Sequence, residues 1–306
     1  MSNSATQTVD YASSTTPPRD RRPNVLVVLC VAAALVPVFV FGGPHATAVF
    51  ATILFEAIWP VITLVLATLL GMTLTHPLAK SANVPLRIAT GGVIGIGVLV
   101  TCIFVLGVSW MLDSLAVNLV IVVLGLVGVA GVGWQLMRAR RDDKLAAFAN
   151  WQPSAGAWLW PIACVSLGMA LVAATMPAGT MWGGEPNGYD VVSYHLTIPQ
   201  AWHDAGNMAP LGNSVFSYMP LATETLFLLQ ISFLGDALTA MYACQLLNVG
   251  IGVLLVIGVY GAVLGDDGSR GLAATIAACV RANPSPAFSK ELKLGTDVEA
   301  RPSFAG

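Results

Sequence analysis

The chain has 306 residues, of which 56% are hydrophobic and 10% are charged, and its mean hydropathy is +0.76. Soluble globular domains carry about 25% charged residues, so this composition excludes an ordinary soluble enzyme and a disordered protein. Lys and Arg number 14 against 16 Asp and Glu, which leaves no basic surplus to bind nucleic acid. The sequence therefore indicates a polytopic membrane protein.

Long apolar runs recur along the chain, and in lipid each must be a helix, because only a helix satisfies its own backbone polar groups there. We expect an all-α transmembrane bundle of seven to eight spans with one large extracytoplasmic loop that carries short interfacial helices. The eighth run begins at Gly271 and stops after ten residues. The earlier runs cover residues 24–42, 47–74, 86–110, 115–137, 155–177, 219–234 and 237–264.

The chain divides into four parts by composition. Residues 1–22 are rich in Ser, Thr and Pro and are expected to form a disordered cytoplasmic tail. Residues 23–150 form a four-helix transmembrane region, and residues 151–280 form a second membrane region. Residues 281–306 are polar and unpatterned, which indicates either a disordered tail or a frame shift or truncation near position 280.

Basic residues predict the orientation of the bundle, because cytoplasmic loops carry an excess of Lys and Arg. A cytoplasmic N-terminus places nine Lys and Arg residues in cytoplasmic segments and none in the opposite loops 43–46, 111–114 and 178–218. Only Arg270 falls on the wrong side in this scheme. The long polar interval 178–218 is therefore expected outside the cytoplasm.

Glycines cluster within two of the predicted spans. Small residues let helix backbones approach closely in membranes, so we interpret them as packing positions inside one bundle rather than as a dimer face. These residues are Gly91, Gly92, Gly95, Gly97, Gly125, Gly128, Gly131 and Gly133.

The interval 178–218 is the main candidate for chemistry, because it holds many aromatic and polar residues that no span requires. Such aromatics suit either a bilayer interface or a sugar-binding cleft, and the sequence does not separate these uses. Residues 190–206 predict short surface helices, with Pro199 in a first turn and Gly206 at an end. The residues expected to face lipid are Val191, Val192, Leu196, Ile198 and Trp202.

Asp190 is the candidate general base, because a carboxylate among aromatics can take the proton of a hydroxyl. The alternative is that Asp190 caps the helix that follows it. Glu224 either faces the same outer cavity or extends toward the interface. A divalent metal site is a weaker hypothesis, with Glu185, His195 and His203 as candidate ligands. Its alternative is a set of interfacial histidines that hydrogen-bond to headgroups or to the loop backbone.

Residues 188–199, which read GYDVVSYHLTIP, resemble the D-x-x-x-Y-H-L-x-x-P signature of bacterial membrane glycosyltransferases with the GT-C fold, within the dolichyl-phosphate-mannose mannosyltransferase-like superfamily. Residues 213–220 and Glu224 resemble the second half of that signature. The resemblance implies a sugar, hexose or pentose, transferred from a polyprenyl-phosphate donor to a glycan, lipid or protein acceptor outside the cytoplasm. It implies Asp190 as the general base.

The same resemblance implies that Tyr194, His195, Trp202 and Glu224 bind substrate. It places the chain in the bacterial inner (plasma) membrane among membrane lipids. Family members usually have further helices after this point. By this comparison, one expectation is that the chain is an incomplete enzyme, shortened at its C-terminal end. The interval 178–218 has no Lys or Arg to balance a leaving phosphate, so that charge falls to a metal, a protonated histidine or a residue elsewhere. The alternatives are a transporter-like protein and a non-catalytic membrane protein that descends from an enzyme.

Overall fold

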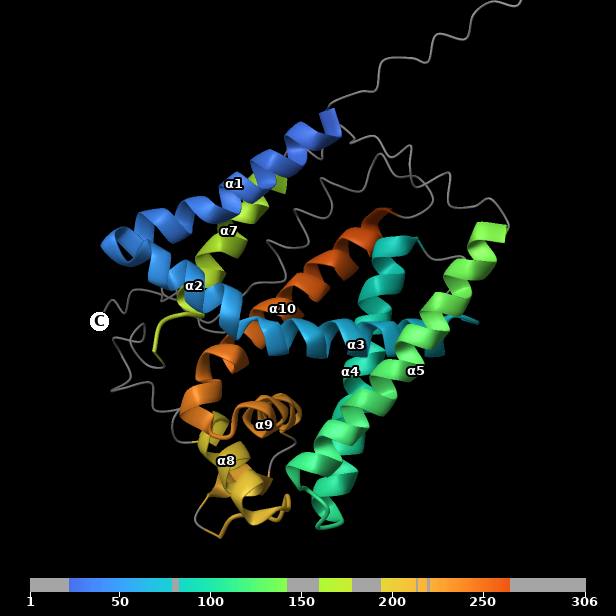
Figure 1. Cartoon of the computed structure of the whole chain (residues 1–306), viewed down its shortest axis with the longest axis vertical. Helices are drawn as coiled ribbons and strands as arrows, with labels where there is room; N and C mark the ends of the chain where they lie inside the picture. Colours follow the sequence, from blue (N-terminus) through green and yellow to red (C-terminus); the bar gives the residue numbers. More distant parts are fainter. Residues whose placement is uncertain are drawn as a thin grey trace, which may run out of the picture.

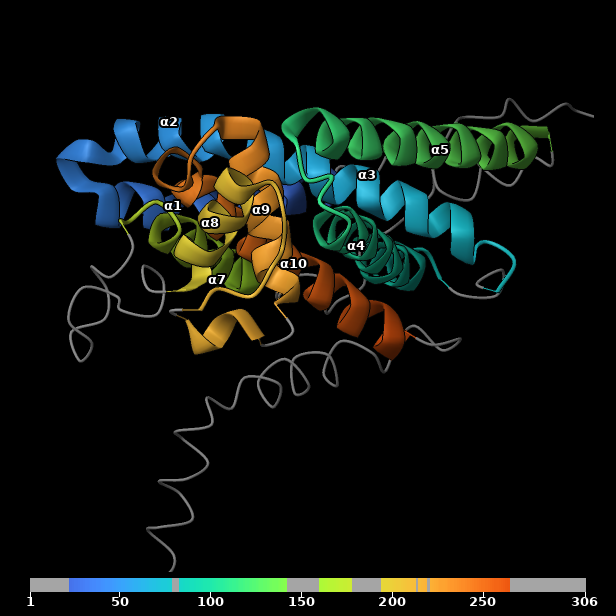
Figure 2. The same cartoon turned by 90° about the horizontal axis from the view of Figure 1, so that it is seen from below.

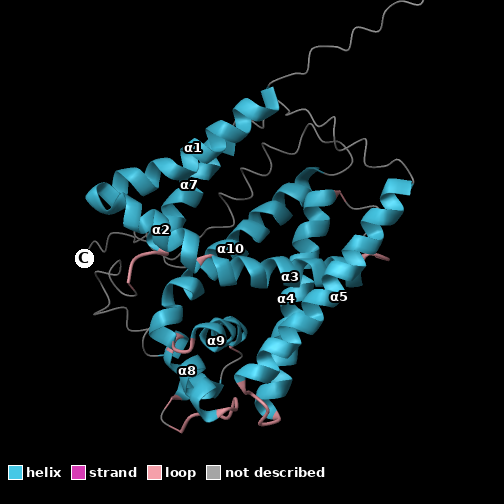
Figure 3. Ribbon diagram, in the orientation of Figure 1, coloured by secondary structure: helices cyan, strands magenta, loops and turns pink. Residues whose placement is uncertain are grey.

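The structure, a computed structural model, describes residues 22–78, 83–141, 160–177, 194–212, 214–218 and 221–264. Every regular element in these ranges is a helix, and none of the ranges contains a strand (Figure 3). The expected all-α class is therefore confirmed for the described residues. In chain order the helices are α1 (Arg22–Gly42), η1 (Gly43–His45), α2 (Ala46–Glu56), α3 (Ile58–Thr75), α4 (Val84–Val108), α5 (Ser114–Arg141), α7 (Trp160–Ala173), α8 (Thr197–Ala205), η4 (Val215–Tyr218), α9 (Ala222–Leu234) and α10 (Ala237–Leu264).

Four helical stretches in these ranges are long and apolar enough to cross a membrane, and they indicate a membrane protein. They are Val25–Thr75, which runs from α1 to α3, then Val84–Val108, Leu115–Arg138 and Ala237–Ala262.

Two of the predicted spans contain shorter helices. The helix within 155–177 is α7, with 14 residues, and the helix within 219–234 is α9, with 13 residues. A 13-residue helix is about 20 Å long, whereas the hydrocarbon core is about 30 Å thick. By its length alone, α9 does not reach across a bilayer.

The long helices pack as two groups connected through α10 (Figures 1 and 2). In one group, α3 crosses α4 and α5; in the other, α1 lies beside α7. Helix α10 packs against α4 and α3, and it also contacts α7. Helices α8 and α9 lie against each other at the lower end of the view in Figure 1.

Glycines allow the close approach of α3 to its neighbours. A Cβ atom at Gly95 would lie 1.7 Å from the carbonyl oxygen of Ala67, and one at Gly71 would lie 1.8 Å from the carbonyl oxygen of Gly91. On α5, a Cβ atom at Gly128 would lie 2.5 Å from the backbone nitrogen of Leu70. Such contacts confirm the packing interpretation for six of the predicted glycines, whereas a Cβ atom at Gly97 or Gly133 would have nothing within 4 Å. The six are Gly91, Gly92, Gly95, Gly125, Gly128 and Gly131.

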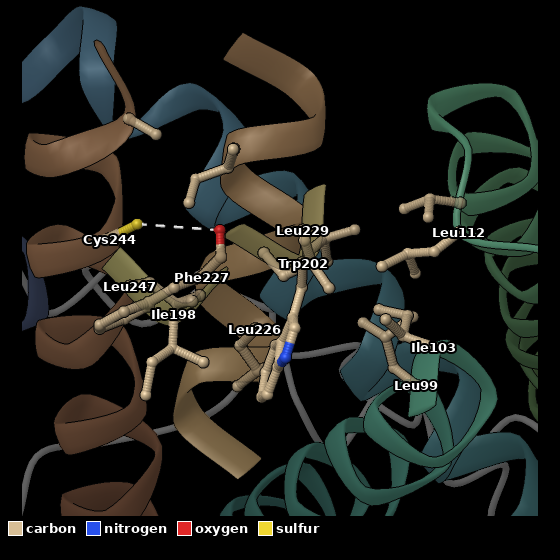
Figure 4. Close-up of a cluster of buried hydrophobic side chains, with 14 of the residues drawn as sticks. Leu99, Ile103, Leu112, Ile198, Trp202, Leu226, Phe227, Leu229, Cys244 and Leu247 are labelled. Atoms are coloured by element: carbon tan, nitrogen blue, oxygen red, sulfur yellow. Dashed lines mark hydrogen bonds between the residues drawn. The ribbon is translucent and has the colours of Figure 1, made fainter. Parts of the chain in front are cut away.

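Helix α9 lies at the centre of the largest apolar cluster. Its residues 224–232 are all buried, and the side chains of α8, α4 and α10 surround it. Figure 4 shows Ile198 and Trp202 of α8 directed toward Leu226 and Leu229 of α9. One polar contact also reaches α3, where the Gln230 amide nitrogen donates to the Thr63 hydroxyl oxygen at 3.2 Å.

The expectation that Leu196, Ile198 and Trp202 face lipid is wrong. All three side chains are buried within the protein, with at most 6% of each residue exposed. The reason is that α9 packs against the apolar face of α8, so these two helices bury each other's side chains. The predicted boundaries of α8 are confirmed. Pro199 lies in its first turn, and Gly206 ends it in the left-handed conformation with φ +65°.

The segment after α8 docks on the turn between α4 and α5. The backbone N–H of Leu112 donates to the carbonyl oxygen of Gly206 at 3.2 Å, and the N–H of Met208 donates to the carbonyl oxygen of Gly107 at 3.1 Å. Two backbone hydrogen bonds therefore fix α8 at the Val108 end of α4.

Helix α10 begins at an aspartate cap. The Asp236 carboxylate accepts the N–H groups of Leu238 and Thr239 and, at 2.5 Å, the Thr239 hydroxyl. The Thr239 hydroxyl and then its N–H lower the pKa of Asp236 below the ordinary value of 3.8. The cap therefore supports α10 at neutral pH and loses its effect as the pH falls through that lowered pKa.

Candidate functional site

A histidine and a buried glutamate meet where the segment before α8 lies against the start of α9. The distance from His195 Nδ1 to Glu224 Oε1 is 2.5 Å. The Glu224 side chain is only 6% exposed, whereas the His195 side chain is 34% exposed. The pair therefore has a buried acidic end and a partly accessible imidazole end.

The position of Glu224 in α9 favours a carboxylate. Glu224 is the third residue of α9 and lies in its first turn. Unpaired N–H groups and the helix dipole give this end of a helix a partial positive charge, which stabilises an acidic side chain. An ionised carboxylate can only accept hydrogen bonds, so Nδ1 of His195 is the donor when Glu224 is ionised.

The His195 imidazole lies at one end of a short series of stacked aromatic rings. The Tyr194 ring lies 4.1 Å from the His195 ring between centroids, tilted by 46°. On η4, the Phe216 ring stacks on the Tyr194 ring at 4.4 Å and 21°. Tyr218 of the same short helix is 68% exposed. Apolar rings therefore lie beside a polar pair, which is the combination of groups that binds sugars and lipid headgroups.

Trp202, a predicted substrate-binding residue, lies in the core instead of beside the pair. Only 4% of the residue is exposed, and its indole N–H donates to the carbonyl oxygen of Ala209 at 3.1 Å. This hydrogen bond joins the buried indole to the loop that follows α8. A substrate-binding role for Trp202 stays a prediction.

The candidate metal ligands do not gather in the part of the chain that the structure describes. His203 lies near the end of α8, with Nδ1 3.5 Å from Asp204 Oδ1, and His195 is paired with Glu224. Within the described ranges, no three His, Cys, Asp or Glu side chains lie close enough to hold a metal ion. Glu185 lies outside these ranges, and so does Asp190, the predicted general base.

Sequence reasoning identified both members of the pair but not their contact. His195 was expected to bind the sugar donor, and Glu224 was expected to line the outer cavity. No contact between the two residues was predicted. They are 29 positions apart, and their contact depends on how α8 packs on α9. The only available signal was that each belongs to one half of the same signature.

Comparison with protein families, curated proteins and solved structures finds no match to this chain.

Proposed function

We propose that this chain is an integral membrane glycosyltransferase of the GT-C type, located in the bacterial inner membrane with a cytoplasmic N-terminus. It transfers a sugar from a polyprenyl-phosphate donor to an acceptor outside the cytoplasm. Asp190 takes the proton of the acceptor hydroxyl, and that oxygen forms a bond to the anomeric carbon of the sugar. The bond from this carbon to the phosphate oxygen breaks, and polyprenyl phosphate leaves with the electron pair.

One observation carries this proposal: the contact between His195 and Glu224. It joins the two halves of the glycosyltransferase-like signature at one place, beside the stacked rings of Tyr194 and Phe216. Two motif halves that act on one substrate are expected to converge in this way.

In the proposed site, His195 binds the phosphate of the donor. A protonated imidazole has two N–H donors, and Glu224 accepts the one on Nδ1. The other, on Nε2, is left for a phosphate oxygen. This use of His195 supplies a cation in an interval that has no Lys or Arg between positions 178 and 218.

The decisive experiment is the Asp190→Asn substitution in the full chain. Asparagine keeps the shape of the side chain but does not accept the proton, and general-base catalysis contributes about 10²–10⁴-fold. We expect release of polyprenyl phosphate, from a panel of radiolabelled polyprenyl-phosphate hexoses and pentoses, to fall at least about 100-fold.

The matched control is Asp204→Asn on α8. This carboxylate is exposed, and the asparagine oxygen still accepts the hydrogen bond that Gln200 donates to Asp204 Oδ1 at 2.7 Å. Transfer is expected to stay at the level of the unmodified chain. Equal transfer by Asp190→Asn and the unmodified chain would show that the general-base assignment is wrong.

A further inference from the structure

The packing of α9 bears on how the chain crosses the membrane. If 219–234 is counted as a span, α10 runs from the cytoplasmic side to the opposite side of the membrane. Arg270 is then the single basic residue outside the cytoplasm in the predicted scheme. The two ends of α4 mark the two sides of the membrane, because its 25 residues extend over about 37 Å, more than the thickness of the hydrocarbon core. Each end of α4 contacts a different part of the C-terminal half of the chain.

Both ends of α9 lie against one short helix, α8. At its start, Glu224 contacts His195, two residues before α8 begins. Just after its end, the N–H of Ala237 donates to the side-chain oxygen of Gln200, within α8, at 2.6 Å. Helix α8 has nine residues and is about 13 Å long, so both ends of α9 lie near the same short helix, which docks at the Val108 end of α4.

The environment of residues 224–232 of α9 is protein. Leu228, Leu229, Gln230 and Ile231 have no exposed surface, and α9 packs against α8, α10, α5, α4 and α3. Figure 1 shows α9 nearly end-on beside α8, while the long helices run across the same view. A helix with these surroundings and this direction does not carry the chain through lipid.

The two ends of α10 lie at opposite ends of α4. Its first residues adjoin α8, which is fixed at the Val108 end of α4 through Gly206 and Met208. Near its last turn, the Gly261 carbonyl oxygen accepts the Asn83 side-chain amide at 2.7 Å, just before α4 begins. A Cβ atom at Gly261 would lie 2.4 Å from the backbone nitrogen of Leu86, so the two helices nearly touch there.

We infer that α9 does not cross the membrane, because both of its ends lie on the α8 side, and that α10 returns the chain to the side of Arg87. Arg87 lies at this end of α4, where its guanidinium donates to Gln135 near the basic end of α5. Arg270 then follows α10 on the same side as the other basic residues. The single exception to the charge bias disappears, and 219–234 is removed from the count of spans.

The test is one-sided cysteine labelling of the full chain with a membrane-impermeant maleimide. Ser269→Cys reports the side reached after α10. Leu78→Cys, 87% exposed between α3 and α4, marks the Arg87 side, and Gly212→Cys, in the exposed turn after α8, marks the other side. The unmodified chain gives the background of the native cysteines, which all lie in apolar runs.

We expect Ser269→Cys to label together with Leu78→Cys and from the opposite side to Gly212→Cys. With α8 outside the cytoplasm, Gly212→Cys alone reacts in intact cells, and the other two react only after permeabilisation. Labelling of Ser269→Cys together with Gly212→Cys would overturn the inference, because α9 would then cross. Asp267→Cys gives the same reading if Ser269→Cys does not react in detergent. The result is independent of the proposed chemistry, because labelling requires no activity.

Discussion

At the scale of single residues, the main feature is the buried carboxylate of Glu224 and its contact with His195. A carboxylate that is 6% exposed in an apolar cluster is unfavourable unless it is paired. Its partner His195 and its place in the first turn of α9 supply that pairing. Removing either group leaves the other without its partner, so the pair is expected to act as a unit.

We predict that Glu224→Gln separates activity from folding. The amide oxygen still accepts from His195 Nδ1, so the free energy of unfolding should fall by only about 1 kcal/mol, the difference between a charged and a neutral hydrogen bond. Transfer should fall about 10-fold or more, because the neutral amide no longer balances the charge of an imidazole that binds the donor phosphate.

Thermal unfolding in detergent and release of polyprenyl phosphate measure the two effects. Glu56→Gln is the control, because Glu56 is half-buried at the end of α2, on a different element from the pair. A Glu224→Gln chain that transfers sugar as fast as the control would remove the pair from the mechanism.

At the scale of elements, contact between α3 and α4 depends on residues without side chains. Gly71, Gly91 and Gly95 bring the two backbones within a distance that no Cβ atom fits. In lipid, such close van der Waals packing replaces the hydrophobic effect as the force that joins helices. The stripe is therefore a structural requirement of the bundle.

We predict that Gly95→Ala lowers the free energy of unfolding by about 1–3 kcal/mol, because the added methyl group would meet the Ala67 carbonyl at 1.7 Å and the helices must separate. Gly97→Ala is the matched control on the same helix, where nothing lies within 4 Å of the new atom. Denaturation in detergent, followed by circular dichroism, compares the two. Equal stability of both variants would contradict the packing argument.

At the scale of the whole molecule, the outer surface of the long helices is apolar. Large hydrophobic side chains are exposed along α1, α3, α4 and α5, whereas the core lies around α9. A surface of this kind suits lipid and not water. The polar pair His195–Glu224 lies apart from it, at the α8 end of the bundle.

We predict that Leu126→Arg, at the middle of α5, reduces the yield of membrane-integrated protein. Leu126 is 64% exposed, and a charge at the centre of a span costs about 2.5–3.5 kcal/mol on insertion scales. Leu115→Arg is the control: Leu115 is 70% exposed but lies in the first turn of α5, where a long side chain reaches the interface. Quantification of the carbonate-resistant membrane fraction compares them. Equal yields would show that the centre of α5 does not face lipid.

The sequence predicted local features well where one residue type decides the outcome. The predicted run 237–264 has the same bounds as α10, and Gly206 ends α8 as expected, because glycine tolerates a left-handed conformation. In both cases the cause lies within a few residues of the effect.

The direction of the apolar face of α8 was not predictable from its sequence. An apolar stripe buries itself equally well in lipid or in protein, so Ile198 and Trp202 gave the same pattern for both. The role of 219–234 was open for a related reason: a short apolar run has the same pattern in a membrane span and in a helix buried by its neighbours.

The sequence by itself determined that the chain is helical and belongs in a membrane, because apolar content and the cost of unpaired backbone groups in lipid leave no other choice. It also predicted which polar residues are candidates for a functional site. Only the tertiary structure decided that His195 meets Glu224, and that α9 stays inside the protein. Both depend on contacts between segments far apart in the chain, and such contacts are fixed by the packing of whole helices.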